Sequence, residues 1–207
     1  MLIIKSKKIA GVKYQKLNLS VDHKGIRVIT YNWLDLFQAG EEDIFEMIYT
    51  KRCTSSPCVV EGLYSIPQQK ILLRCFQGCM NLFLADLRNN SETFLKTERL
   101  KLRSSWSMDS NLYQGGLIPE GVVWGVEQAE PNSILLIQTS RPVDFAQVQM
   151  INPLDEQLGT LFDGIEFSVI DAFSREMKTV QEFLDLRAQD NRVDELTGRL
   201  SEVLERN

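Results

Sequence analysis

The sequence has almost no histidine, and this scarcity limits the chemistry open to the chain. His23 is the only histidine among the 207 residues. A metal site built from two or more histidines is therefore excluded, and a catalytic triad would have to use His23. His23 lies between turn-forming residues, Asp22 and Gly25, which is typical of an exposed loop.

Catalytic signatures are missing as well. The chain contains no phosphate-binding glycine loop, no G-x-G-x-x-G motif and no G-x-S-x-G motif. Carboxylates are plentiful, but no local pattern selects an acid–base pair such as Glu127 with Asp144. We therefore lean against an enzyme and name no catalytic residue.

Long hydrophobic runs are also missing. No stretch approaches the roughly 18 apolar residues of a membrane span. The first residues become basic from Lys5 onward, before an apolar stretch of signal-peptide length can form. We therefore expect an intracellular, by default cytoplasmic, protein with no membrane partner and with cysteines that are not disulfide-bonded.

What the sequence does contain is a series of short apolar segments separated by turn residues. Residues 59–65 and 70–76 flank a turn at Pro67, and residues 121–128 and 133–139 flank a turn at Pro131, so both pairs are typical of hairpins. This spacing predicts an α+β, predominantly β fold, an antiparallel β-barrel or β-sandwich over residues 1–172. A C-terminal helical tail follows over residues 173–207.

Two apolar stripes with helical spacing mark the tail. The inner stripe is Phe173, Met177, Val180 and Leu184, with Ser174 as a candidate cap. The outer stripe is Val193, Leu196, Leu200, Val203 and Leu204. At about 100° per residue the two stripes lie on nearly opposite sides of one helix axis. We therefore predict a break near residues 188–192 and expect the outer stripe to dock on another surface.

The four cysteines form two close pairs, Cys53 with Cys58 and Cys75 with Cys79. Two close pairs at the open end of a hairpin can supply the four thiolates of a zinc site. Their spacings depart from the common two-residue gap, and a lone cysteine in an apolar strand is more often a core residue. Zinc is therefore one reading of the cluster and four buried or free thiols are the other.

Basic residues gather in two places although the net charge is −5. The first group is Lys5, Lys7 and Lys8, and the second is Arg99, Lys101 and Arg103, which alternate with leucines and should face outward from a strand. Together they can form a phosphate-binding strip for nucleic acid. The alternative interpretation is that these basic side chains are simply solvent-exposed on a protein that is acidic overall.

Three functions remain open at this point. The leading hypothesis is a non-enzymatic interaction or assembly module that binds a protein partner, or itself, through the outer stripe. The first alternative is a zinc-stabilised, nucleic-acid-associated factor. The second is a small-ligand-binding β-barrel, with or without enzymatic activity, whose pocket Trp33, Trp106 and Trp124 can line.

Overall fold

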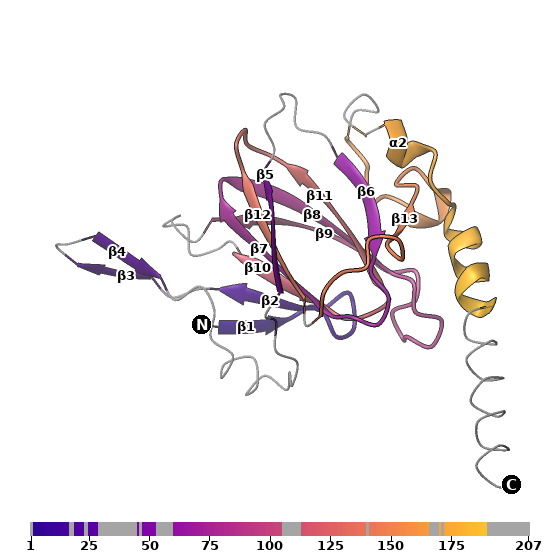
Figure 1. Cartoon of the computed structure of the whole chain (residues 1–207), viewed down its shortest axis with the longest axis horizontal. Helices are drawn as coiled ribbons and strands as arrows, with labels where there is room; N and C mark the ends of the chain where they lie inside the picture. The colour runs from indigo at the N-terminus through magenta and orange to yellow at the C-terminus, as the bar shows by residue number, and fades with distance from the viewer. Residues whose placement is uncertain are drawn as a thin grey trace, which may run out of the picture.

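Antiparallel strands make up most of the structure, a computed structural model in which two large sheets face each other (Figure 1). The structure describes residues 2–16, 19–22, 25–28, 45, 47–52, 60–104, 113–139, 141–165, 170 and 172–189. The predicted fold class is therefore confirmed: the chain is predominantly β, with a small helical part at its C-terminal side.

The first sheet has six strands in the order β1-β2-β10-β7-β12-β5. These strands are β1 (Leu2–Lys5), β2 (Lys13–Lys16), β10 (Gly115–Ile118), β7 (Ile71–Gln77), β12 (Ile134–Thr139) and β5 (Met47–Arg52). The second sheet has five strands in the order β13-β6-β11-β8-β9. These are β13 (Gln149–Ile151), β6 (Val60–Ser65), β11 (Val122–Gln128), β8 (Cys79–Asp86) and β9 (Thr97–Arg103).

A third, two-stranded sheet pairs β3 (Leu19–Asp22) with β4 (Gly25–Val28). In Figure 1 this hairpin lies apart from the two large sheets, on the side opposite the C-terminal helices. The helical elements are the short 3₁₀ helix η1 (Glu156–Leu158), α2 (Ala172–Arg175) and a helix over residues 180–189.

The two predicted hairpins are wrong, although their strands are correct. The chain crosses from one sheet to the other between β6 and β7, and again between β11 and β12. β6 pairs with β11 and β13, whereas β7 pairs with β10 and β12. A short turn between two strands can therefore be a corner of the sandwich instead of a hairpin. The predicted hairpin was the reason to expect Cys58 close to Cys75, so that expectation has no support from the fold.

The sharpest corner is the single residue between β7 and β8. Gly78 has a positive φ of 76° and packs against Ser133 on the corner between β11 and β12. A Cβ atom at position 78 would lie 2.2 Å from the hydroxyl oxygen of Ser133. That hydroxyl accepts a hydrogen bond from the Cys79 amide at 3.1 Å, so the two corners are joined.

The main core lies between the two sheets and follows from the alternation of the strands. In β11, Val122, Trp124 and Val126 point between the sheets, while Val123 points to the outer face of the five-stranded sheet. A register shift against β6 between Trp124 and Val126 marks a β-bulge at this place.

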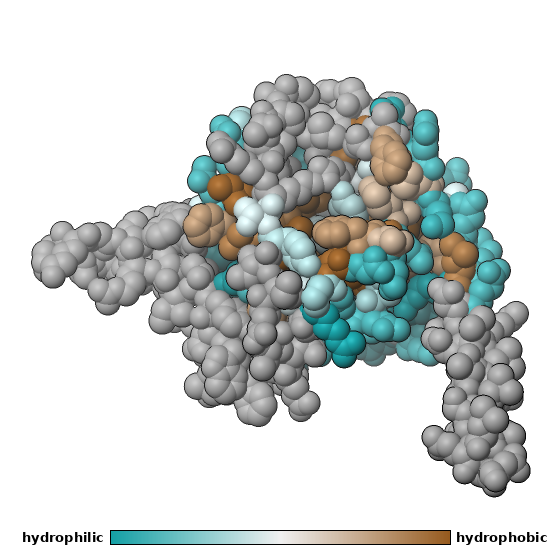
Figure 2. All heavy atoms as spheres, in the orientation of Figure 1, coloured by the Kyte–Doolittle hydropathy of each residue, from teal (hydrophilic) through white to brown (hydrophobic). Residues whose placement is uncertain are grey.

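A second core covers the outer face of the five-stranded sheet. Phe83 and Val123 of the sheet pack there with Val180 and Phe183 of the C-terminal helix, and all four side chains are buried. Figure 2 shows that the surface over this C-terminal part is largely hydrophilic, while hydrophobic residues reach the surface nearer the centre of the view.

The C-terminal helix starts later than the sequence predicts. Ser174 caps no long helix; its hydroxyl instead accepts a hydrogen bond from the amide of Gly62 at 2.8 Å. Phe173, expected on the buried stripe, is 61% exposed because the chain turns before the helix begins at residue 180. No helix in the part of the chain that the structure describes is long and apolar enough to cross a membrane.

Candidate ligand-binding site

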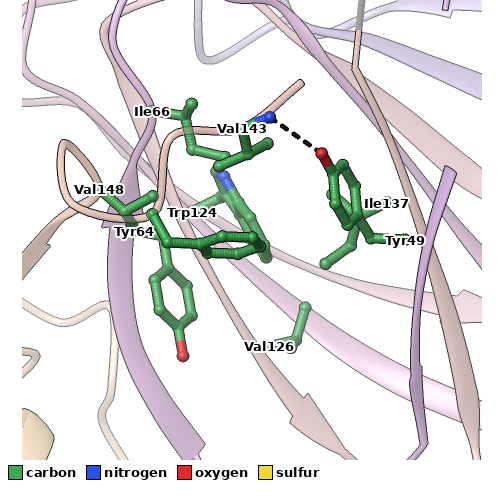
Figure 3. A pocket seen from close by; sticks show the side chains of 9 residues that line it. Tyr49, Tyr64, Ile66, Trp124, Val126, Ile137, Val143 and Val148 are labelled. Atoms are coloured by element: carbon green, nitrogen blue, oxygen red, sulfur yellow. Dashed lines mark hydrogen bonds between the residues drawn. The ribbon is translucent and has the colours of Figure 1, made fainter. Parts of the chain in front are cut away.

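A hydrophobic cavity of about 200 Å³ lies between the sheets. It is called the Trp124 pocket below and is lined by Tyr49, Tyr64, Ile66, Trp124, Val126, Ile137, Val143, Phe145 and Val148. Both sheets contribute, since Trp124 and Val126 come from β11 and Ile137 comes from β12. The inward positions of the strands thus form the walls, and the segment after β12 forms the rim (Figure 3).

Aromatic rings organise the walls of the pocket. Tyr64 of β6 packs beside Trp124 with ring centroids 5.1 Å apart and planes tilted by 41°. This contact follows from strand pairing, because Tyr64 lies opposite Trp124 in the β6–β11 register. The two rings make one continuous aromatic surface on the five-stranded sheet.

The rim is fixed to the six-stranded sheet by a hydrogen bond. The phenol oxygen of Tyr49 on β5 accepts a hydrogen bond from the amide of Val143 at 2.9 Å (Figure 3). Phe145 meets the Tyr49 ring edge to face at 5.9 Å, yet its side chain is 72% exposed. Phe145 therefore lies where the wall of the pocket meets the surface of the protein.

One polar atom in the wall lacks a partner. Trp124 is 4% exposed, and its Nε1 atom has no hydrogen-bond partner among the described residues. In Figure 3 this nitrogen lies toward Ile66 and Val143, away from Val126. A buried donor without an acceptor costs free energy of about 1–3 kcal/mol, so an acceptor that reached it would be bound favourably.

Of the three tryptophans predicted as pocket residues, Trp124 lines a pocket. Trp33 and Trp106 lie outside the described residues. Sequence reasoning does not single out Tyr49, Tyr64 or Phe145. Alternation along β6 places Tyr64 and Leu63 on opposite faces of the sheet. That Tyr64 lies beside Trp124 follows only from the pairing of β6 with β11, whereas the hairpin prediction pairs β6 with β7.

The described half of the predicted zinc site gives zinc no support. Burial raises the pKa of Cys75 to about 12, and burial also raises the pKa of Cys79. The Cys75 thiol donates to the carbonyl oxygen of Gly78 at 3.4 Å, so it has a hydrogen-bond partner within the protein. Within the described ranges, no three histidine, cysteine or carboxylate side chains gather closely enough to hold a metal ion. Cys53 and Cys58 lie outside these ranges.

The predicted basic strip is partly neutralised by carboxylates. β9 presents Arg99 and Lys101 outward and buries Leu102, as the alternation predicts. Arg99 lies 3.9 Å from Glu127, and Arg103 lies 3.2 Å from Glu130. Lys5, Lys7 and Lys8 are exposed. Nucleic acid as a partner stays a prediction.

Two groups of residues named from the sequence remain: Glu127, considered for an acid–base pair, and the residues of the outer stripe. Glu127 points away from the pocket, since it follows the inward-facing Val126 and accepts a hydrogen bond from Asn81 at 2.6 Å. The docking residues of the outer stripe lie outside the described part of the chain; they are Val193, Leu196, Leu200, Val203 and Leu204.

The fold and the pocket define a class: a jelly-roll β-sandwich with a hydrophobic cavity between its sheets. Residues 6–180 match the dTDP-4-dehydrorhamnose 3,5-epimerase family. The chain belongs to this family. No curated protein sequence matches the chain.

Solved structures share the fold at low sequence identity. The dTDP-4-dehydrorhamnose 3,5-epimerase of Bacillus anthracis, solved with TDP and PPi bound, has a TM-score of 0.74 at 18% identity, over 86% of this chain and 98% of that one. A 4-keto-6-deoxy sugar epimerase from the novobiocin biosynthetic gene cluster of Streptomyces spheroides has a TM-score of 0.76 at 19% identity, over 90% of each chain. The dTDP-6-deoxy-D-glucose-3,5-epimerase of Legionella pneumophila, solved with dTDP-4-keto-L-rhamnose, has a TM-score of 0.72 at 18% identity, over 87% of this chain and 93% of that one.

Family membership corrects the leading functional hypothesis. An interaction or assembly module is wrong as the main function, because the family that matches residues 6–180 consists of sugar-nucleotide epimerases. The family gives no support to the zinc-stabilised, nucleic-acid-associated factor either. The small-ligand-binding β-barrel, the second alternative, agrees best with the fold and the pocket.

Proposed function

We propose that the chain binds a small organic ligand in the Trp124 pocket. The observation that carries the proposal is a hydrophobic cavity with an unpaired, buried indole N–H in its wall. Ligand sites are commonly apolar hollows in which a few polar groups orient the ligand. The related fold solved with dTDP-4-keto-L-rhamnose supports a ring-shaped ligand for this architecture.

The indole N–H resonance of Trp124 reports on binding directly. The chain has three tryptophans, and Trp124→Phe identifies the resonance because it removes only that signal. The panel to be titrated contains ring-sized fragments, TDP and dTDP-4-keto-L-rhamnose. We expect at least one of these compounds to shift the Trp124 indole resonance in two-dimensional NMR spectra. If every compound leaves the resonance of the folded protein unmoved, the proposal is wrong.

Two phenylalanine variants, one inside the cavity and one outside it, give the control. Val126→Phe adds bulk inside the cavity and should abolish the shift, at a cost of about 1–3 kcal/mol from overpacking. Leu154→Phe introduces the same phenylalanine side chain at a position that is 40% exposed and should leave the shift intact. Thermal unfolding of both variants establishes that each is folded during the titration.

Epimerisation of a dTDP-linked 4-keto-6-deoxy sugar is the second candidate function, and family membership favours it. Epimerisation next to a ketone proceeds by removal and return of a proton on carbon. Incubation of the protein with such a sugar nucleotide in D₂O therefore tests it. Catalysed deuterium incorporation at carbons 3 and 5 is the expected result for an epimerase.

A further inference from the structure

The segment that joins β12 to β13 crosses from one sheet to the other beside the Trp124 pocket. Residues 141–148 of this segment are called the strap below. Six of these eight residues are exposed and none is buried, although Val143, Phe145 and Val148 line the pocket. The strap thus forms part of the pocket wall without contributing a side chain to any of the cores.

The other parts of the pocket wall are held more firmly. Five lining residues lie on strands that are hydrogen-bonded to their neighbours, namely Tyr49, Tyr64, Trp124, Val126 and Ile137. Ile66 directly follows β6. Local opening of a protein takes place where the fewest bonds and buried contacts have to be broken. The strap is therefore the part of the wall that can move while both sheets stay intact.

Few hydrogen bonds join the strap to the sheets within the described part of the chain. At the first residue of the strap, the Thr139 hydroxyl donates to the carbonyl oxygen of Arg141 at 2.6 Å. Gln69 Nε2 donates to the carbonyl oxygen of Pro142 at 3.4 Å, which is long for such a bond. The turn over residues 144–147 is bonded within the strap itself and does not tie it to a sheet.

Tyr49 fastens the middle of the strap. Its phenol oxygen accepts the hydrogen bond from the Val143 amide at 2.9 Å, and its ring meets the Phe145 ring edge to face at 5.9 Å. Tyr49 is held in turn by the pairing of β5 with β12, in which it lies opposite Ile137. One tyrosine on a strand therefore makes both a polar contact and a ring contact with the strap.

The strap covers an atom that reports on its position. Trp124 Nε1 lies toward Ile66 and Val143 (Figure 3), and it is buried without a hydrogen-bond partner among the described residues. A buried N–H exchanges with D₂O only when water reaches it, so its hydrogen exchange measures opening of the wall above it.

We infer that the strap is the gate of the Trp124 pocket and that Tyr49 is its latch. The pocket opens when the hydrogen bond between Tyr49 and Val143 breaks and the strap moves away, while the two sheets stay in place. The gate deepens the proposed function, on which its role in ligand entry rests, by naming the path into that site. The opening itself is measurable without any ligand.

Hydrogen exchange of the Trp124 indole N–H in D₂O, followed by two-dimensional NMR on the full chain, tests the gate. Trp124→Phe identifies the resonance. Tyr49→Phe removes the phenol oxygen and keeps the ring, so exchange should become about fivefold faster, the effect of one ordinary hydrogen bond. Tyr113→Phe removes a phenol oxygen from a partly buried ring outside the pocket and should leave the exchange rate unchanged.

Phe145 and Phe173 give a second matched pair, because both side chains are exposed and their truncation leaves the cores intact. Phe145 is 72% exposed and Phe173 is 61% exposed. Phe145→Ala removes the ring contact with Tyr49 and should make exchange of the Trp124 indole N–H about threefold faster. Phe173→Ala, on α2, should not change the exchange rate.

The amide of Leu82 supplies the reference for unfolding of the sandwich, since Leu82 is fully buried on β8 between β11 and β9. Low concentrations of urea should speed exchange of this amide and leave the Trp124 indole N–H unaffected. An equal response of the two groups to urea would mean that the pocket opens only when the sandwich unfolds, and would overturn the gate. Unchanged indole exchange in both Tyr49→Phe and Phe145→Ala would overturn it as well.

The gate and the proposed function can fail separately. If a compound of the titration panel shifts the Trp124 resonance while Tyr49→Phe leaves indole exchange unchanged, the gate is wrong and the ligand site stands. If Tyr49→Phe speeds indole exchange while no compound shifts the resonance, the strap opens as inferred and the ligand site is wrong.

Discussion

Asp86, the last residue of β8, is a buried carboxylate surrounded by hydrogen-bond donors. Arg88 Nε donates to it at 2.8 Å, and the hydroxyl groups of Ser91 and Thr93 each donate at 2.6 Å. Burial alone raises the pKa of Asp86, but these hydrogen bonds outweigh burial and hold the pKa at about 2. The charged carboxylate thus organises the turn that leads out of the five-stranded sheet.

We predict that Asp86→Asn lowers the free energy of unfolding at pH 7 by about 2 kcal/mol, the size of a hydrogen bond to a charged group. The folded pKa lies below the ordinary value of 3.8, so the stabilisation is complete above that value and is lost as the pH falls toward 2. Urea unfolding of both proteins at pH 7 and pH 2.5 measures this. The difference between them should shrink at the lower pH, and a difference that stays constant would contradict a role for the charge.

The role of Cys75 cannot be read from its residue type and its neighbours in the sequence. The sequence allows it to be a zinc ligand or a core residue, because both kinds of cysteine occur in apolar surroundings. The choice depends on which strand lies beside β7. With β10 and β12 as neighbours, Cys75 points into the main core and its thiol is protonated, and no local pattern carries that information.

Strands as elements are predictable in this chain, whereas their partners are not. β6, β7, β11 and β12 all fall on segments with the expected β-branched and apolar content. The turn at Pro67 and Gln68 suits a hairpin and a corner equally, because a few residues can reverse the chain within one sheet or across two. Gln68 adopts a positive φ of 56° there, which is not evident from its residue type.

The helix over residues 180–189 begins with a capping box that the sequence contains but that Ser174 obscures. The Glu182 amide donates to the Thr179 hydroxyl at 3.1 Å, and the Thr179 amide donates to the Glu182 carboxylate at 2.7 Å. These reciprocal bonds satisfy amide groups that have no partner within the helix. The same bonds lower the pKa of Glu182.

We expect Thr179→Ala to lower the free energy of unfolding by about 1 kcal/mol, the usual effect of losing such a cap. Glu182→Ala in the same background should add little, because the box acts as a unit. Chemical denaturation measures both, with Glu176→Ala on an exposed neighbouring side chain as the control. Strict additivity of the two changes would show that the two side chains act separately.

At the scale of the whole molecule, two cores share one sheet. The main core lies between the sheets, and the second core joins the outer face of the five-stranded sheet to side chains from Leu158 to Phe183. Composition and strand spacing predict the sandwich, and helical periodicity predicts a packed C-terminal element. The pocket could be predicted only in part, through Trp124, because its walls come from four strands whose order the sequence does not reveal.

Phe183 tests whether the C-terminal helix belongs to the cooperative fold. Its side chain is fully buried in the second core, so Phe183→Ala should lower the free energy of unfolding by about 4 kcal/mol. Phe173→Ala removes the same group at a position 61% exposed and should change it by less than about 0.5 kcal/mol. Equal effects in thermal or urea unfolding would mean that the helix unfolds independently of the sandwich.

At Gly78 and at residues 129–133 the chain passes directly from one sheet to the other. The hydroxyl of Ser133 accepts a hydrogen bond from the amide of Cys79 and so links these two corners. These links oppose separation of the two sheets at this end of the sandwich. Adaptation of this protein to a new ligand would consequently proceed through side chains at the rim, such as Ile66, Val143 and Phe145. The strands behind these side chains form a scaffold, so the rim can change in sequence while the fold is kept.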